Sequence, residues 1–418
     1  MNQIAKIVPY YWIFFTVYAF FRMKYGIYSR LDTIYEICML LYAFYECRTL
    51  RWKLVDRLVL IFVFYSFLSC LSISFSYEII NDWFRSIAFG TLGYFIARSM
   101  KQNQYRIFDT MKFIFPAICI IALFLYFNPT SWYLNYKLHY DYEALSEHVI
   151  IELTRLSGFW EYPYFISYGC FIYLAYFSLK YYNQGLSLEK CMYAFFPVVA
   201  LACFFAQQRV AIVFVICLYA LFHFLLSKRY SIKSLLICDI IIILFSGSFV
   251  ITLKNVVSLD TFDYIVERMV EGTIDRELVT TRFDMFADES SIKNMFIGDG
   301  YGSHNRSSNN VISDNQFLNI YAEFGIIGFI LLYLPIVYSL FKAIRRHRFY
   351  LFELCILLFY LAAMTGANPI NSPDLHPFLF WYCLGLINNN YRYSQIQINN
   401  NEKNNSNSSS SVLSIPGK

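Results

Sequence analysis

Long apolar runs separated by polar connections dominate this chain. A helix needs ~20 apolar residues to cross a bilayer. Runs near that length occupy 7–21, 32–46, 58–76, 83–98, 113–127, 164–180, 191–206, 210–226, 234–252, 315–341, 350–366 and 375–388. The pattern predicts an all-α, polytopic membrane protein with about twelve transmembrane helices.

Two polar connections, 128–163 and 253–314, are much longer than the others. Long loops on one side of a membrane are where binding and catalytic residues are usually placed. We therefore expect one transmembrane domain over 1–388 that includes both loops. The remainder, 389–418, is rich in Asn and Ser and is predicted to be a disordered cytoplasmic tail, because it cannot bury a core.

Charge gives this arrangement an orientation. Charged residues make up 15% of the chain, against about a quarter in soluble domains, which fits a lipid environment. Lys and Arg collect in four short connections, 47–57, 98–112, 227–233 and 342–348, which all fall on one side. Segment 128–162 has five carboxylates against two basic residues, and 254–313 has ten against six. Both termini are predicted to be cytoplasmic and both large loops periplasmic.

Several kinds of site are not indicated by the residue spacing. The eleven cysteines lie in apolar runs or at their edges, and the six histidines are scattered without metal-ligand spacing. The segment Gly298–Gly302 lacks the Lys of a phosphate-binding loop and is predicted to form a turn. We expect no metal, no cofactor and no nucleic-acid partner.

Four arginines are candidates for binding an anionic substrate. Arg155, Arg209 and Arg282 are predicted on the outer side, where the positive-inside rule disfavours them. Arg85, in run 83–98, is a further candidate near its outer end. One such arginine could snorkel to the interface or pair with a nearby carboxylate. Several at one face favour a clamp for a diphosphate, because guanidinium binds phosphate oxygens bidentately and stays charged.

Three patches of sequence, taken in order, resemble a known family. They are Arg155–Gly158, Gln207–Ala211 and the run Thr281–Gly328. Together with the topology they resemble the bacterial O-antigen polymerases and O-antigen ligases. In the ligases a His-Asn pair, nine intervening residues and a Gly-x-x-Gly motif follow one another, whereas here Asp314 stands where the His would be, before Asn315. The polymerase is therefore favoured over the ligase.

The resemblance implies an enzyme that polymerises lipid-linked oligosaccharide repeat units of O-antigen or capsular polysaccharide. It would transfer the growing glycan from polyprenyl diphosphate to another lipid-linked repeat unit, at the periplasmic face of the bacterial inner membrane. The four arginines would hold the diphosphate. A general base must accept the proton of the attacking hydroxyl, and the candidates are Asp314, Glu323 and Glu161. Asp314 could instead be the N-cap of the run 315–341.

The implied partners are a polyprenyl-diphosphate-linked oligosaccharide and membrane lipid, with a chain-length regulator and a flippase as further candidates. Two alternatives stay open: an O-antigen ligase, and a repeat-unit flippase or other transporter. Transporters tend to carry paired repeats and ionisable residues near the middle of the membrane. The apolar runs here are mostly uncharged at their centres, and the polar residues collect in the predicted outer loops.

Overall fold

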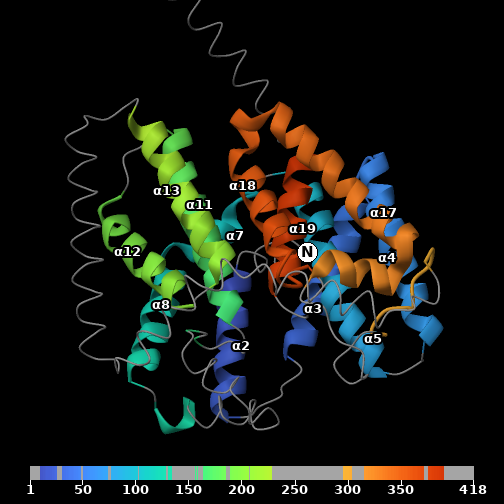
Figure 1. The fold of residues 1–418 in the computed structure, drawn as a ribbon, viewed down its shortest axis with the longest axis horizontal. Coiled ribbons are helices and arrows are strands. Elements are labelled where there is room, and N and C mark those ends of the chain that lie inside the picture. The colour runs from blue at the N-terminus through green and yellow to red at the C-terminus, as the bar shows by residue number, and fades with distance from the viewer. Residues whose placement is uncertain are drawn as a thin grey trace, which may run out of the picture.

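The fold is a bundle of helices (Figure 1). The computed structural model describes residues 10–25, 31–48, 50–73, 77–101, 103–128, 130–133, 156, 158, 163–184, 189–206, 208–227, 295–303, 315–370 and 375–389. Within these residues every regular element is helical and there is no strand. The all-α prediction is confirmed for this part of the chain.

The helices follow the predicted apolar runs. The first group comprises α2 (Tyr11–Tyr25), α3 (Leu31–Cys47), α4 (Leu54–Ile73), α5 (Tyr77–Trp83), the π-helical turn η2 (Phe84–Ala88), α6 (Phe89–Ser99), α7 (Arg106–Asp109) and α8 (Met111–Phe127). The second comprises α11 (Pro163–Gln184), α12 (Lys190–Phe205), α13 (Arg209–Ser227), α17 (Gln316–Arg345), α18 (His347–Ala363) and α19 (Leu375–Asn388). Every predicted run within the described residues coincides with a helix, while 234–252 lies outside them.

Two described helical segments, Leu54–Ser72 and Gln316–Arg345, are long and apolar enough to cross a bilayer. The segments Met111–Phe127, Ala194–Phe205 and Arg209–Leu221 are apolar but shorter. Length and composition thus indicate membrane association for α4 and α17. The arrangement of twelve spans stays a prediction.

The helices pack as two groups joined by α18. On one side α4, α6, α17 and α19 pack together, and on the other α8, α11, α12 and α13 do; α18 contacts members of both (Figure 1). The tightest pair is α6 with α19. A Cβ added at Gly93 would lie 2.3 Å from the Phe378 carbonyl oxygen, and one at Gly385 would lie 2.3 Å from that of Tyr94. Small residues therefore let these two backbones approach closely.

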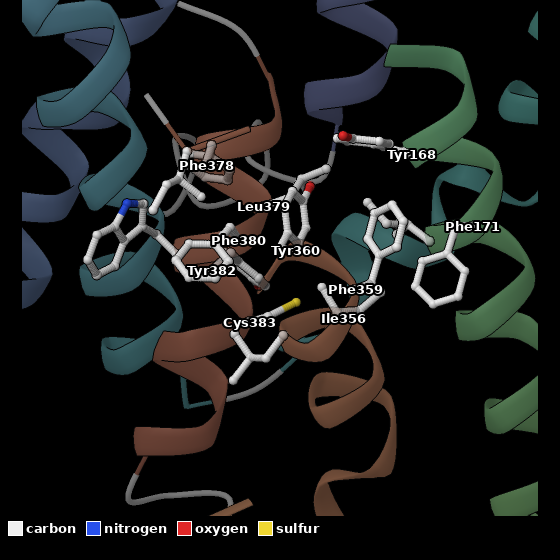
Figure 2. Close-up of a cluster of buried hydrophobic side chains, with 14 of the residues drawn as sticks. Tyr168, Phe171, Ile356, Phe359, Tyr360, Phe378, Leu379, Phe380, Tyr382 and Cys383 are labelled. Atoms are coloured by element: carbon white, nitrogen blue, oxygen red, sulfur yellow. The ribbon is translucent and has the colours of Figure 1, made fainter. Parts of the chain in front are cut away.

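An aromatic core fills the junction around α18. Tyr168 and Phe171 of α11 meet Phe359 and Tyr360 of α18, and all four side chains are buried (Figure 2). The Phe171 and Phe359 ring centroids are 4.3 Å apart, and the Tyr168 ring meets Phe359 edge to face at 4.9 Å. Such contacts add to the hydrophobic burial of large rings. They hold the two helix groups together.

Polar contacts concentrate at the two ends of α4 and α17, which run antiparallel. The predicted basic connections meet at one end, where Arg98 Nη2 donates to the Arg51 carbonyl (3.2 Å) and Lys342 Nζ to that of Ile387 (2.6 Å). Asn389, expected in the disordered tail, is buried there, and its Nδ2 donates to the Ala97 carbonyl (2.7 Å). The packed domain therefore includes Asn389, and the rest of the tail lies outside the described residues.

Candidate functional site

The opposite end of the bundle contains a break in α17. Gly325 has φ 62° and ψ −168°, so the helix consists of two stretches separated at this residue. A break in a helix leaves backbone N–H and C=O groups without their usual partners, which is costly away from water. Something outside the helix must satisfy them.

The segment 295–303 supplies those partners. Its backbone joins both sides of the break through four hydrogen bonds: Asp299 N to Ala322 O (2.8 Å), Gly300 N to Glu323 O (2.9 Å), Ile326 N to Met295 O (3.1 Å) and Ile327 N to Phe296 O (3.1 Å). The segment therefore docks into α17 mainly by its main chain.

Two glycines make this docking possible. A Cβ at Gly298 would lie 2.4 Å from the Glu323 carbonyl oxygen, and one at Gly325 would lie 2.4 Å from that of Phe296. Gly298, Gly300 and Gly302 have φ values of 75°, 98° and 80°, which L side chains rarely adopt. A turn begins within the predicted stretch, where the Ser303 amide donates to the Gly300 carbonyl (3.2 Å), and the segment closes onto α17.

Helix α4 fastens the docked segment from the other side. The Tyr65 hydroxyl lies within hydrogen-bond distance of the Ile297 carbonyl (3.1 Å) and the Phe324 carbonyl (3.0 Å). One turn further along α4, the Ser69 hydroxyl accepts a hydrogen bond from the Tyr301 amide (3.2 Å). One helix thus holds both the segment and the break.

Docking places two carboxylates next to the glycine-rich turn. The Tyr301 hydroxyl, almost fully buried, donates to Asp82 Oδ2 (2.8 Å). The next residue, Gly302, donates its amide to Glu323 Oε1 (3.1 Å). Glu323, a predicted base that is buried, therefore lies in a polar cluster together with the half-buried Asp82, which the sequence analysis did not select. We call Asp82, Arg85, Tyr301 and Glu323 the outer cluster, after the side of the membrane on which the sequence analysis predicts Arg85.

Arg85 gives the outer cluster its positive charge. It belongs to η2, and π-helical turns within helices occur often at functional sites. Its Nε lies 3.8 Å from Glu36 Oε1 of α3, and the Glu36 side chain is 3% exposed. Arg85 also lies within electrostatic reach of Asp82. The guanidinium is thus flanked by two carboxylates on separate helices.

The protonation states of Asp82 and Tyr301 follow from this environment. Burial raises the pKa of Asp82, and the Tyr301 hydroxyl and the Arg85 charge oppose that rise. Burial, together with the charges of Asp82 and Glu323, raises the pKa of Tyr301. Tyr301 therefore keeps its proton as a donor, while Asp82 is a stronger base than an ordinary aspartate.

Close to this cluster, α17 begins beside an apolar groove. Asn315 is its N-cap, with Oδ1 accepting from the amides of Phe317 (3.0 Å) and Leu318 (3.3 Å), so the capping position is Asn315 rather than Asp314. The groove has a volume of about 490 Å³ and is lined by Asn315, Phe317, Leu318, Tyr321, Ile326 and Phe329. An open apolar surface therefore runs past the break.

The structure brings some of the predicted site residues together and separates another. Arg85 and Glu323 belong to the outer cluster. Arg209 is exposed at the start of α13, which packs against α11, α12 and α18 in the other helix group. Arg155, Arg282, Asp314 and Glu161 lie outside the described residues. Leu156, which follows Arg155, donates its amide to the Phe205 carbonyl (3.0 Å), close to the turn that carries Arg209.

Sequence reasoning missed Glu36, Asp82 and Tyr301. Glu36 lies inside the apolar run 32–46, and a carboxylate within such a run is itself a signal of function. Asp82 directly precedes another run, three residues before Arg85. Tyr301 gave no local signal, because its partner is 219 positions away along the chain.

Comparison with known proteins gives no family assignment. A scan against protein-family models finds no match to this chain, and a search among curated proteins also finds none.

Proposed function

We propose that this protein is a polysaccharide polymerase of the bacterial inner membrane, with both termini cytoplasmic. It would extend O-antigen or capsular glycans from lipid-linked repeat units at the periplasmic face. One observation supports this most: the segments 295–303 and Asn315–Gly328, which both lie within the family resemblance or at its edge, interlock through four backbone hydrogen bonds. Segments that share a motif and also dock on each other are suited to forming one active site.

The proposed reaction needs a base and an anion clamp but no redox step. A sugar hydroxyl of one lipid-linked repeat unit attacks the anomeric carbon of the glycan on a second lipid. A new glycosidic C–O bond forms, and the C–O bond to the diphosphate breaks. The hydroxyl proton passes to a carboxylate, and polyprenyl diphosphate leaves with the bonding electrons. Arginines stabilise the charge that develops on this leaving group.

The outer cluster provides candidates for these roles. Asp82 is the base that the geometry favours, since burial raises its pKa and Tyr301 holds it in place. Glu323 accepts a hydrogen bond from the Gly302 amide and stays a second candidate base in the same cluster. Asp314 and Glu161 stay candidates. Arg85 would contact the diphosphate, with Arg155, Arg209 and Arg282 as further ligands.

The groove along α17 suits the lipid portion of the substrate. Its lining is almost wholly apolar, as an isoprenoid chain is, and it includes Ile326, next to the break. A chain bound there would bring its diphosphate towards the end of the helix that carries Glu323.

The direct test is an in vitro reaction of purified protein with a defined lipid-linked repeat unit. We expect the wild type to produce a ladder of polymers. Asp82→Asn and Arg85→Gln should each lower the rate by roughly 10²–10³-fold. Arg57→Gln, an exposed substitution near the opposite end of α4, is the matched control and should leave the ladder intact. Normal ladders from both cluster variants would remove the outer cluster from the proposal.

Deletion of the gene separates the alternatives in cells. Single repeat units at the cell surface indicate loss of a polymerase. Repeat units trapped on the cytoplasmic side indicate loss of a flippase, and full-length polymer retained on the lipid carrier indicates loss of a ligase. Either of the last two results would contradict the proposed reaction.

A further inference from the structure

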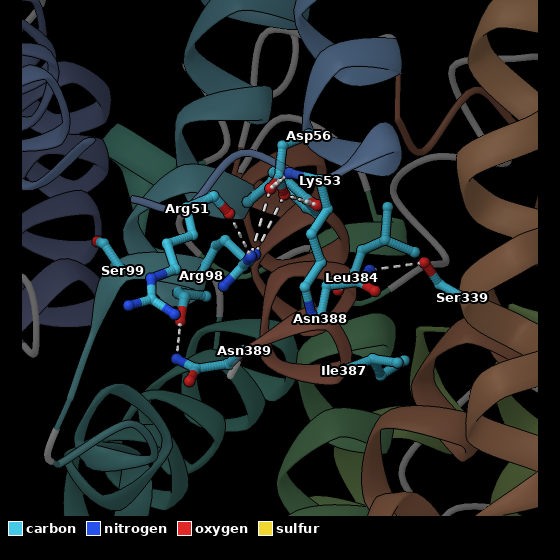
Figure 3. A network of polar contacts seen from close by, with 12 residues as sticks. Arg51, Lys53, Asp56, Arg98, Ser99, Ser339, Leu384, Ile387, Asn388 and Asn389 are labelled. Carbon is cyan, nitrogen blue, oxygen red and sulfur yellow. Dashed lines mark hydrogen bonds and ion pairs between the residues drawn. The ribbon is translucent and has the colours of Figure 1, made fainter. Parts of the chain in front are cut away.

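A second polar cluster lies at the opposite end of the bundle, far along α4 and α17 from the outer cluster. Its centre is the ion pair between Asp56 and Arg98, each 1% exposed (Figure 3). Asp56 accepts four hydrogen bonds: from Tyr94 Oη (2.5 Å), Arg98 Nε (3.1 Å), Arg98 Nη2 (3.3 Å) and the Lys53 amide (2.7 Å). A carboxylate has about four acceptor positions. Asp56 is therefore saturated, and its charge offsets that of Arg98.

Three more cations surround this pair. Lys342 Nζ donates to the Ile387 carbonyl (2.6 Å) and to Asn388 Oδ1 (3.4 Å) at the end of α19. Its electrostatic neighbours are Lys53, Arg98 and Arg346 on the positive side and Asp56 on the negative side. Burial lowers the pKa of Lys53, and the charges of Arg98 and Arg346 lower it further, against the opposing effect of Asp56. Among the described groups in these interactions, Lys53, Arg98, Lys342 and Arg346 are cationic and Asp56 is the carboxylate.

The cations open onto the surface beside an apolar helix face. Lys53 and Arg346 are exposed, and Lys342 is partly exposed. On α17 the side chains of Val337, Tyr338 and Phe341 are 43%, 54% and 60% exposed and lead directly towards Lys342. A ligand that suits this surface needs an anionic head for the cations and an apolar tail for the helix face. Basic pockets between helix ends have this chemistry when they bind phospholipid headgroups.

We propose that Lys53, Lys342 and Arg346 form a binding site for the phosphate headgroup of an anionic phospholipid. The acyl chains lie along the exposed face of α17 through Tyr338 and Phe341. The bound phosphate places negative charge beside these exposed cations, and it joins the start of α4 to the ends of α17 and α19. This inference does not depend on the reaction proposed above.

The test measures lipid retention by the full-length protein. Protein purified in detergent is titrated with phosphatidylglycerol or phosphatidylcholine, and bound lipid is counted by native mass spectrometry. We expect selective binding of phosphatidylglycerol. The double variant Lys53→Gln/Arg346→Gln should bind phosphatidylglycerol about thirtyfold more weakly. Each of the two cations near the anionic headgroup contributes about equally to this loss of affinity.

Three controls keep the outcome interpretable. The charge-preserving variant Lys53→Arg/Arg346→Lys should retain binding, which separates loss of charge from loss of fold. Arg106→Gln removes an exposed cation of α7 outside the cluster and should leave binding unchanged. Free glycerol phosphate should not displace the lipid at equal concentration. Equal binding by wild type and Lys53→Gln/Arg346→Gln, an equal loss in Arg106→Gln, or displacement by glycerol phosphate would each overturn the proposal.

Discussion

The substitution Gly325→Ala tests whether the break in α17 depends on the docked segment. The new Cβ would lie 2.4 Å from both the carbon and the oxygen of the Phe296 carbonyl and 2.5 Å from the Gly298 amide nitrogen. These are backbone atoms, so no change of rotamer can relieve the clash. The backbone at Gly325 (φ 62°, ψ −168°) is also a conformation that alanine strongly disfavours.

The expected cost has two parts. Holding a non-glycine residue in that conformation costs about 1–3 kcal/mol. Moving the segment away to remove the clash gives up the four hydrogen bonds across the break, each worth about 1 kcal/mol net. We expect Gly325→Ala to weaken docking of the segment 295–303 by roughly 5–7 kcal/mol, while the helices away from the break keep their packing.

Hydrogen exchange followed by mass spectrometry measures this locally. A loss of ~3 kcal/mol in local stability speeds amide exchange by more than about a hundredfold. In Gly325→Ala we expect that acceleration in peptides covering 295–303 and 322–327, together with loss of the polymer ladder. Gly366→Ala is the matched control, because a Cβ there meets no atom within 4 Å. Exchange in the two peptides that is the same in both variants would refute the interlock.

Three further predictions concern the same end of the bundle and the helix pair beside it. Tyr65→Phe should lower the free energy of unfolding by about 1–2 kcal/mol, because the Tyr65 hydroxyl lies near two carbonyls. Its control, Tyr338→Phe at an exposed position, should change that free energy little. Because burial raises the pKa of Asp82, a reaction that needs its carboxylate is lost as pH falls through that raised value. On the acid side of the pH–rate profile, the rate should thus begin to fall at a pH above ~4, the pKa of an ordinary aspartate. Asp82→Asn should abolish the activity that shows this pH dependence. Gly385→Val should prevent folding or lower the melting temperature sharply, as its Cβ would lie 2.3 Å from a backbone oxygen of α6; a melting curve like that of wild type would contradict the close packing.

The helices could be predicted from the sequence because apolar runs of this length have few alternatives to helical structure. The gathering of basic residues also has a structural counterpart: Arg98 and Lys342 come from different predicted connections and meet at one end of the bundle. The observed N-cap of α17 is Asn315, one residue after the predicted Asp314. Asp and Asn cap helices equally well, so the sequence alone cannot tell which of two adjacent residues is the cap.

The outer cluster could be predicted only in part. Glu323 and Arg85 were visible as charges in or beside apolar runs. Their connection through Tyr301 and Asp82 was not, since it depends on a segment that inserts into a helix from the preceding loop. The run 315–341 reads as one continuous span, and Gly325 in its interior carries no sign of a break. A glycine within a helical pattern is tolerated at modest cost, so its presence alone cannot distinguish a kink from close packing.

The break in α17 is more informative than the charges around it. An unbroken helix would satisfy its own backbone, so a break at this position offers no advantage to the helix itself. What it provides is a fixed attachment for the segment 295–303 that does not depend on side-chain identity, because the four bonds are between backbone groups. Tyr301 and Gly302 are then held against Asp82 and Glu323. A Cβ at Gly298 would clash with the backbone of 323–325, and a Cβ at Gly325 would clash with the backbone of 296–298. A larger residue at one position therefore cannot be compensated by a change at the other. Both glycines are therefore required for the same geometry, and substitution of either should remove the outer cluster while leaving its charged residues in the chain.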